Sequence, residues 1–208
     1  MVSVVLTWLS SIIIHIISSG GYLGVMMLMA LESACLPVPS EIIMPFAGFL
    51  VWQGRFIFWQ VIFWGALGNL IGSIVAYAVG YWGGRELIIK YGKYVLISAD
   101  DLARADRWFQ KYGQFAIFFS RLMPVVRTFI SLPAGIARMN FKKFCFYTFL
   151  GSLFWSGFLA YAGLSLGQNW DILKVYFHKF DLVIGLSLVA AAIWWLGRHL
   201  LRNQKIYE

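Results

Sequence analysis

The chain has 208 residues, of which 61% are hydrophobic and 12% are charged, and its formal net charge is +8. A soluble domain is usually about 45–50% apolar and about 25% charged. The composition therefore excludes an ordinary soluble globular domain and predicts an integral membrane protein. Basic cytoplasmic loops account for the positive charge, so we infer no nucleic-acid partner. Two cysteines in apolar surroundings, Cys35 and Cys145, predict neither a disulfide framework nor a metal site.

Residues 4–18 form the first apolar stretch, which is short for a membrane span of about 20 residues. No Lys or Arg precedes residue 55, and no A-x-A site follows the stretch, which argues against a cleaved signal peptide. Its serine and threonine side chains fall near one helical stripe. This pattern favours a weakly amphipathic helix at the membrane interface, and a short first span fits the same residues equally well.

Residues 22–50 are apolar but contain two carboxylates, Glu32 and Glu41, and several prolines. A proline in a helix interior removes a hydrogen bond and clashes with the preceding turn, so we expect helix breaks at Pro37 and Pro39. Non-helical backbone at membrane depth is tolerated only inside the protein or beside a cavity. The segment therefore predicts a re-entrant hairpin of two half-helices that enters and leaves by the same face.

The second half-helix of this hairpin is predicted to begin after Pro39. Ser40 belongs to the residue types preferred at the N-cap, so its hydroxyl is expected to cap the helix. Glu41 then falls in the first turn, where the helix dipole stabilises negative charge. Gly48, near the end of the hairpin, is expected to be a further helix break.

Residues 58–82 are uncharged and long enough to cross a membrane. Gly68 and Gly72 in this segment have the spacing that lets helices approach closely in lipid, although glycine is also common in membrane helices in general. Asn69 is a polar group within the same span, and a helix–helix hydrogen bond is favoured over a substrate contact for it.

Residues 113–135 form a second interrupted apolar segment, which contains Arg121 and Arg127. An intact helix would place two residues six positions apart on different faces. A break between them allows both arginines to face one cavity, and the segment is predicted to be a second re-entrant hairpin. Helix breaks are expected at Pro124, Pro133 and Gly135.

Residues 144–166 and 181–201 are apolar in their centres and long enough to be full spans. If residues 113–135 are re-entrant, twelve Lys and Arg residues gather on one side of the membrane and three on the other. The positive-inside rule then places the basic side and the C-terminus in the cytoplasm. A fully crossing segment would split the basic residues between both faces, so the charge pattern favours the hairpin.

The predicted fold is an all-α integral membrane protein. It is an inverted repeat of two re-entrant hairpins, each followed by a transmembrane helix, with a further C-terminal transmembrane helix. The first part, residues 1–21, is an amphipathic or short membrane helix, and residues 22–166 form the transport core. Residues 167–208 hold the last span and a basic tail. Inverted repeats with broken helices meeting near the midplane are a transporter architecture.

Two blocks of sequence resemble a known family. They are "LESACLPVPSEIIMPFAGFL" at 31–50 and "FSRLMPVVRTFISLPAGIARMNFKKF" at 119–144, and "GYWGGR" at 80–85 resembles the family's glycine-rich end of the intervening span. The chain is identified as a member of the DedA family, which shares its core with VTT-domain lipid scramblases. The resemblance covers roughly residues 20–170.

The resemblance implies two facing re-entrant hairpins with essential acidic and arginine residues, which fall on Glu32, Glu41, Arg121 and Arg127. It also implies movement of lipids across the bacterial inner membrane. Undecaprenyl phosphate is the best-supported cargo in the family, phosphatidylethanolamine is implied for other members, and several depend on the proton-motive force. Some members have Pro-Gly-Asp where this chain has Pro39-Ser40-Glu41, and this departure puts the lipid in doubt.

The four intramembrane charges are functional candidates on physical grounds as well, because each ionised group at a helix centre costs about 2.5–3.5 kcal/mol. Arginine donates two parallel hydrogen bonds to phosphate oxygens, so Arg121 and Arg127, with Glu41 and Ser40, are the candidate substrate-binding residues. The carboxylates suit proton coupling. Glu32, the deeper one, is assigned as the group that takes up the proton, with Glu41 as the arginine partner.

The functional hypothesis is a flippase for a phosphate-bearing lipid, most of all undecaprenyl phosphate, coupled to the proton-motive force. A phosphatidylethanolamine or general phospholipid flippase or scramblase is the first alternative, and a proton-coupled small-solute or ion transporter is the second. An enzyme is not expected, because the interior has no His, no paired Asp and no Cys–His set. No cofactor and no metal are expected. The partners are the lipid, the membrane and protons, and the sequence leaves a homo-oligomer open.

Overall fold

The computed structural model describes residues 2–36, 38–84, 99–124 and 126–167, and these residues form helices and turns with no strand among them. Three of the described helical segments are long and apolar enough to cross a membrane: Ser11–Ser33, Phe58–Gly84 and Phe141–Ser165. The all-helical membrane architecture is thus confirmed. The predicted span at 181–201, the basic tail and Pro37 lie outside the described residues.

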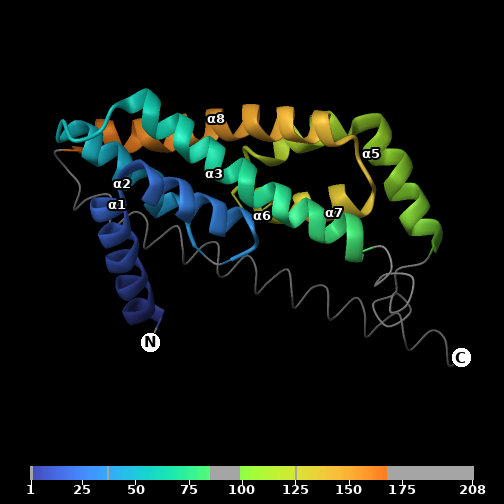
Figure 1. The fold of residues 1–208 in the computed structure, drawn as a ribbon, viewed down its shortest axis with the longest axis horizontal. Helices are drawn as coiled ribbons and strands as arrows, with labels where there is room; N and C mark the ends of the chain where they lie inside the picture. Colours follow the sequence, from blue (N-terminus) through green and yellow to red (C-terminus); the bar gives the residue numbers. More distant parts are fainter. Residues whose placement is uncertain (1, 37, 85–98, 125, 168–208) are drawn as a thin grey trace, which may run out of the picture. The chain divides into compact units, whose positions relative to one another are not determined.

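The first helix, α1 (Val2–Ser33), changes direction at Gly21, whose backbone has φ 59° and ψ −138°. Only glycine adopts this conformation without steric cost. Figure 1 shows the first part of the helix running away from the rest at a steep angle. The helix expected over residues 4–18 lies within the first of two helical stretches, which meet at the kink at Gly21. Whether this stretch lies at the interface or crosses the membrane stays a prediction.

A turn after α1 leads into α2 (Ser40–Trp52). Cys35 lies in the turn with a left-handed φ of 68°, and Pro39 is the N-cap of α2. The predicted break at Pro39 is thereby confirmed, and Glu41 lies in the first turn as expected. The predicted break at Gly48 is wrong, because Gly48 lies buried inside α2.

The helix α3 (Phe58–Val79) continues into a short π-helix, η1 (Gly80–Gly84), and confirms the helix expected at 58–82. Gly68 and Gly72 face α1 so closely that a Cβ atom on either would collide with a backbone carbonyl, that of Met26 or of Ala30. The two glycines therefore let α3 approach α1 closely, as their spacing predicted.

The second interrupted segment comprises α5 (Ala99–Ser120), α6 (Val126–Phe129) and α7 (Ser131–Ile136). Turn residues that include Pro124 separate α5 from α6, which confirms the predicted break there. The breaks predicted at Pro133 and Gly135 are wrong. Pro133 lies in the first turn of α7, where a proline gives up no helical hydrogen bond, and Gly135 is the last but one residue of the same helix.

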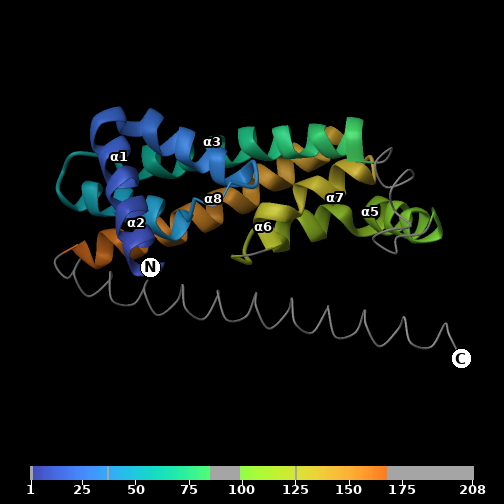
Figure 2. The ribbon, with the colours of Figure 1, turned by 90° about the horizontal axis from the view of Figure 1, so that it is seen from below.

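The last described helix is α8 (Phe141–Ser165), and Asn140 caps it by accepting a hydrogen bond from the Lys143 N–H at 3.1 Å. Figures 1 and 2 show α3 and α8 side by side along their lengths. They are antiparallel, because Gly65 faces Ser156 while the Tyr77 and Phe144 rings lie 4.7 Å apart. The two helices form the centre on which the interrupted segments pack.

The interrupted segments pack on this centre through glycines. Gly48 of α2 faces the Ala160 carbonyl of α8, and Gly163 of α8 faces the Pro45 carbonyl of α2. At the opposite end of the pair, Gly135 of α7 faces the Tyr77 carbonyl of α3, and Gly80 faces the Leu132 carbonyl. The second helix of each interrupted segment, α2 or α7, therefore packs against the long helix that follows the other segment.

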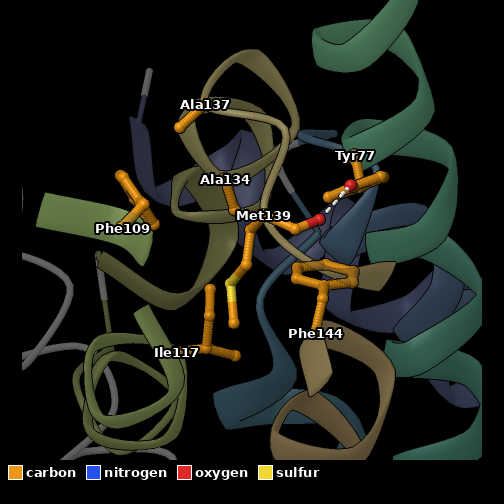
Figure 3. Packing of buried hydrophobic residues seen from close by; sticks show 7 residues of the cluster. All are labelled: Tyr77, Phe109, Ile117, Ala134, Ala137, Met139 and Phe144. Atoms are coloured by element: carbon orange, nitrogen blue, oxygen red, sulfur yellow. Dashed lines mark hydrogen bonds between the residues drawn. The ribbon is translucent and has the colours of Figure 1, made fainter. Parts of the chain in front are cut away.

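A buried apolar cluster fixes the second interrupted segment in place (Figure 3). It joins side chains from α3, α5, α7 and α8, and the Tyr77 hydroxyl donates a hydrogen bond of 2.5 Å to the Met139 carbonyl at its edge. Its members are Tyr77, Phe109, Ile117, Ala134, Ala137, Met139 and Phe144. The cluster holds the chain between α7 and α8 against α3, and so determines where the preceding turn with Arg121 lies.

Candidate functional site

Arg127 is the centre of the candidate site. It lies on α6, and its side chain is 2% exposed. Its Nη2 donates hydrogen bonds to Glu32 Oε1 and Ser40 Oγ, and lies 3.4 Å from Glu41 Oε1. These partners come from the end of α1 and the start of α2, about ninety positions earlier in the chain. The structure therefore brings together Glu32, Ser40, Glu41 and Arg127, as the sequence predicted.

The start of α2 takes part through its backbone as well as its side chains. The Ser40 N–H donates to Glu32 Oε1 at 3.4 Å, so the carboxylate lies at the N-terminus of the helix. The predicted role of the Ser40 hydroxyl as an N-cap is wrong: Pro39 occupies the N-cap position, and no side chain caps the helix. The Ser40 hydroxyl accepts a hydrogen bond from Arg127 instead.

The two carboxylates differ in burial. The Glu32 side chain is 7% exposed and that of Glu41 is 19% exposed. Glu32 is thus the deeper group, as expected, and Glu41 lies nearer the accessible edge of the site. Both contact Arg127, and Glu32 does so more closely, so the arginine is not paired with Glu41 alone.

Arg121 is buried in the turn after α5, and neutral groups hold it. Its Nη1 donates to Asn69 Oδ1 and to the Arg127 carbonyl, each at 3.0 Å, and its Nη2 donates to Ser131 Oγ at 2.7 Å. The expectation that both arginines face the carboxylates is therefore met by Arg127 alone. Arg121 instead fixes the backbone of Arg127. Asn69 accepts its hydrogen bond from this turn, where a helix–helix hydrogen bond was predicted.

Trp155 of α8 is a member of the site that the sequence did not reveal. The Arg127 guanidinium carbon lies 4.9 Å from the centre of the Trp155 ring. Contacts of this kind attract a cation to the face of the ring. A signal was present, since tryptophan in membrane helices gathers at the interfaces and Trp155 stands near the middle of its span.

Several buried polar atoms of the site have no hydrogen-bond partner in the described part of the chain. They include Arg127 Nη1 and Glu32 Oε2. Buried polar groups are nearly always paired, so an unpaired donor and an unpaired acceptor on two bonded side chains mark a place where a ligand can bind. An anion oxygen fits Arg127 Nη1, and a proton fits Glu32 Oε2. Among the described residues, no group of His, Cys, Asp or Glu has the arrangement of a metal site.

Comparison with known proteins agrees with the resemblance in the sequence. Residues 38–165 match the VTT domain. The chain is 40% identical to undecaprenyl phosphate transporter A of Bacillus subtilis, over 82% of this chain and 80% of the relative. It is 29% identical to undecaprenyl phosphate transporter A of Staphylococcus aureus, over 95% of this chain and all of the relative.

A third relative carries a name of another kind. The chain is 31% identical to an alkaline phosphatase-like protein of Lactococcus lactis, over 96% of this chain and 98% of that relative. No solved structure matches the chain significantly. The match to the VTT domain covers more than half of the chain, and the relatives cover most of it. The chain therefore belongs to the VTT-domain, or DedA, family of membrane proteins.

Proposed function

We propose that the protein is a transporter that moves a phosphate-bearing lipid across the bacterial cytoplasmic membrane with the help of protons. The observation that carries the proposal is Arg127, which is buried at the junction of two interrupted helical segments and retains an unpaired donor. Two relatives are named undecaprenyl phosphate transporters, which makes this lipid the first candidate.

The proposal includes two facing re-entrant hairpins, and three features support it. First, α2 has 13 residues and α7 has 6, which is too short to cross a bilayer that requires about 20. Second, each of these helices packs against the long helix of the other repeat through a close glycine contact. Third, the basic residues gather on one side only if the second hairpin is re-entrant. By the same rule the basic side and the C-terminus are cytoplasmic.

The chemistry of the proposed cycle is a competition for Arg127. In the structure its Nη2 is occupied by Glu32 and Ser40. When Glu32 takes up a proton, it loses the charge that holds the arginine, and the guanidinium is free to bind phosphate oxygens with both terminal nitrogens. Because the two arginines and two carboxylates of the site are balanced in charge, protonation leaves a net positive charge that favours an anionic headgroup.

The N-terminus of α2 supplies a second reason for an anionic ligand. Backbone N–H groups at a helix N-terminus attract anions, and the Glu32 carboxylate already lies against the Ser40 N–H. We infer that the carboxylate takes the position that a phosphate oxygen occupies when the lipid is bound. Glu41, the more exposed carboxylate, then repels an arriving phosphate until Arg127 is released.

The test is transbilayer movement of undecaprenyl phosphate in proteoliposomes, with and without a pH gradient. Wild type is compared with Arg127→Lys, which keeps the charge but loses the planar fork, and with Arg127→Gln. Arg55→Ala is the matched control, because Arg55 is an exposed arginine whose described contact is a 3.4 Å hydrogen bond to the Ser18 carbonyl. Size-exclusion chromatography and thermal melting establish that each variant folds.

Movement that requires Arg127 and not Arg55, and that increases with the gradient, is the expected result. Movement of phosphatidylethanolamine in place of undecaprenyl phosphate reassigns the lipid, and movement that ignores the gradient identifies a scramblase. Inorganic phosphate is measured in the same samples because of the phosphatase-like name of one relative. Phosphate release that requires Arg127, without lipid movement, overturns the proposal in favour of an enzyme.

A further inference from the structure

The contact between α3 and α8 contains a line of buried polar residues that the charged site does not use. On α3 they are Asn69 and Ser73, and on α8 they are Thr148 and Ser152, with exposed fractions of 0–2%. Within each helix the two residues are four positions apart and therefore lie on one face. We call these four residues the polar seam.

The two seam residues of α3 lie opposite the two seam residues of α8. Gly65 faces Ser156, and Tyr77 packs on Phe144 twelve positions further along α3 and twelve positions back along α8. In an antiparallel pair this register places Asn69 opposite Ser152 and Ser73 opposite Thr148. The register thus places the four buried polar side chains at two levels of the helix pair.

The hydroxyls on the α8 side of the seam have no hydrogen-bond partner. Thr148 Oγ1 and Ser152 Oγ are fully buried and unpaired among the described residues, as is Ser156 Oγ further along the same face. By contrast, the Ser73 hydroxyl donates to the Asn69 carbonyl at 2.6 Å. Leaving a buried hydroxyl unpaired costs about 1–3 kcal/mol. A row of unpaired hydroxyls on α8 therefore indicates that they bind a small polar molecule.

Water has the right size for these hydroxyls. Residues four apart on a helix have Cβ atoms about 5–6 Å apart. One water molecule that forms two O–H···O hydrogen bonds of about 2.7–2.8 Å spans that separation. Buried waters typically satisfy such otherwise unpaired groups. A lipid headgroup is excluded by the burial of the seam, whereas water and protons are not.

The seam connects with the charged site at one end. Asn69 accepts the hydrogen bond from Arg121, which also holds the Arg127 carbonyl. Gly72, beside Ser73, packs directly on Ser33, the neighbour of Glu32. The seam therefore lies against the second interrupted segment at Asn69 and against the first beside Ser73.

At its other end the seam leads to a cavity. The Tyr77 hydroxyl, one turn beyond Ser73, is bonded to the Met139 carbonyl. Both residues line a cavity of about 450 Å³ between the end of α3 and the chain that enters α8. Arg138, with its guanidinium 5.3 Å from the centre of the Tyr81 ring, lines the same cavity. The cavity thus lies on the basic side of the protein.

We propose that the polar seam is a water-bridged proton pathway between this cavity and Glu32, an inference that rests on the proton coupling in the proposed function. A proton enters on water in the cavity and passes along alternating water and hydroxyl oxygens, each of which accepts one proton and releases another. It ends on Glu32 Oε2, the unpaired oxygen. No charge remains on the seam.

The charges around Glu32 agree with such a delivery. Arg127 from α6 and Glu41 from α2 face it, and Arg121 lies beyond them at the seam. The helix α3 contributes no charged residue. The proton therefore meets its first carboxylate at Glu32, and the lipid can approach from the side of Glu41, which is the more exposed of the two.

The test measures protonation of Glu32 directly in the full-length protein. Time-resolved infrared spectroscopy after a drop in pH follows the carboxyl band that disappears in Glu32→Gln. The double variant Thr148→Val with Ser152→Ala removes the two unpaired hydroxyls. The single variant Thr148→Ser keeps the hydroxyl at its position and loses only the methyl group. Ser156→Ala is the matched control, because it removes an equally buried hydroxyl beyond the junction with Arg121.

The double variant is expected to slow protonation at least about tenfold, the factor equivalent to about 1.4 kcal/mol, or one hydrogen bond lost from the path. Ser156→Ala and Thr148→Ser are expected to keep the rate of the wild type. Equal rates in the double variant and the wild type, or no Glu32 carboxyl band in the wild type between neutral and acidic pH, overturn the pathway.

Lipid movement in proteoliposomes separates this inference from the proposed function. Gradient-driven movement that is unchanged in the double variant, together with an unchanged protonation rate, rejects the pathway and leaves the transporter intact. Slowed protonation in a protein whose wild type moves neither undecaprenyl phosphate nor phosphatidylethanolamine rejects the transporter and leaves the pathway intact.

Discussion

Arg127 distributes its contacts unevenly between its nitrogens. Nη2 faces Glu32, Ser40 and Glu41, and Nε donates to the Pro124 carbonyl at 3.2 Å. Nη1 has no partner among the described residues. Removing one member of a buried ion pair typically costs about 3–5 kcal/mol, because the other charge is left unpaired. The stability of the site therefore depends on whether Glu32 is charged.

Glu32→Gln is predicted to uncouple lipid binding from pH. Glutamine keeps the shape of the side chain and an oxygen that accepts from Arg127, but it has no charge to hold the arginine, so it imitates protonated Glu32. In the wild type, binding of undecaprenyl phosphate is expected to weaken as the pH rises and Glu32 ionises. In the variant the affinity is expected to be the same at all pH values where the lipid phosphate is ionised, and a pH gradient no longer stimulates movement.

Lipid affinity across a pH series and transport with and without a gradient check this prediction. Glu41→Gln is the companion variant, because Glu41 also faces Arg127 but is more exposed and further away. It is expected to retain the response to the gradient. A Glu32→Gln protein with the pH dependence of the wild type assigns the coupling proton to another group.

At the scale of helices, close glycine contacts decide where the interrupted segments lie. Gly48→Ala is predicted to destabilise the protein by about 1–3 kcal/mol, because its Cβ would collide with the Ala160 carbonyl and backbone does not yield easily. Thermal melting is expected to show a decrease of several degrees, with loss of lipid movement. Gly135→Ala is expected to do the same at the other end, against the Tyr77 carbonyl.

Gly157→Ala is the matched control on α8. Its added Cβ would meet Ile62 Cδ1 at 3.5 Å, an ordinary contact. Alanine is favoured over glycine in a helix by about 1 kcal/mol, so the melting temperature is expected to stay the same or increase. Equal destabilisation by Gly48→Ala and Gly157→Ala would show that the stability of the protein does not depend on the close approach of α2 and α8.

The sequence predicted the parts of the site that local chemistry determines. Prolines near charged residues in apolar segments indicated where both helices are interrupted. From these interruptions the sequence predicted that Glu32, Glu41 and Arg127 lie together. The partners of Arg121 were not predictable, because a buried arginine accepts any oxygen within reach and the choice of Asn69 depends on how α3 packs. The glycines were assigned to breaks because sequence alone does not distinguish a flexible backbone position from a close contact inside a helix.

At the scale of the whole molecule, the two interrupted segments also touch outside the site, where the turn after α1 meets α6. The Cys35 thiol lies 3.5 Å from the Thr128 carbonyl oxygen, although the residues are 93 positions apart. A transporter that releases Arg127 from Glu32 has to separate these segments in each cycle. A link between this turn and α6 is therefore expected to stop transport while leaving the fold intact.

Thr128→Cys is predicted to form a disulfide with the native Cys35 under mild oxidation, because the Cys35 thiol already lies against the backbone of residue 128 and a disulfide requires the two residues to be this near. Lipid movement is expected to stop on oxidation and to return with a reductant. The same substitution with Cys35→Ser is the control, in which Cys145 of α8 is the other remaining thiol, and it is expected to be insensitive to oxidation. Full activity in the cross-linked protein would mean that the lipid passes while the turn after α1 and α6 stay together, and that Glu32 and Arg127 separate by side-chain motion alone.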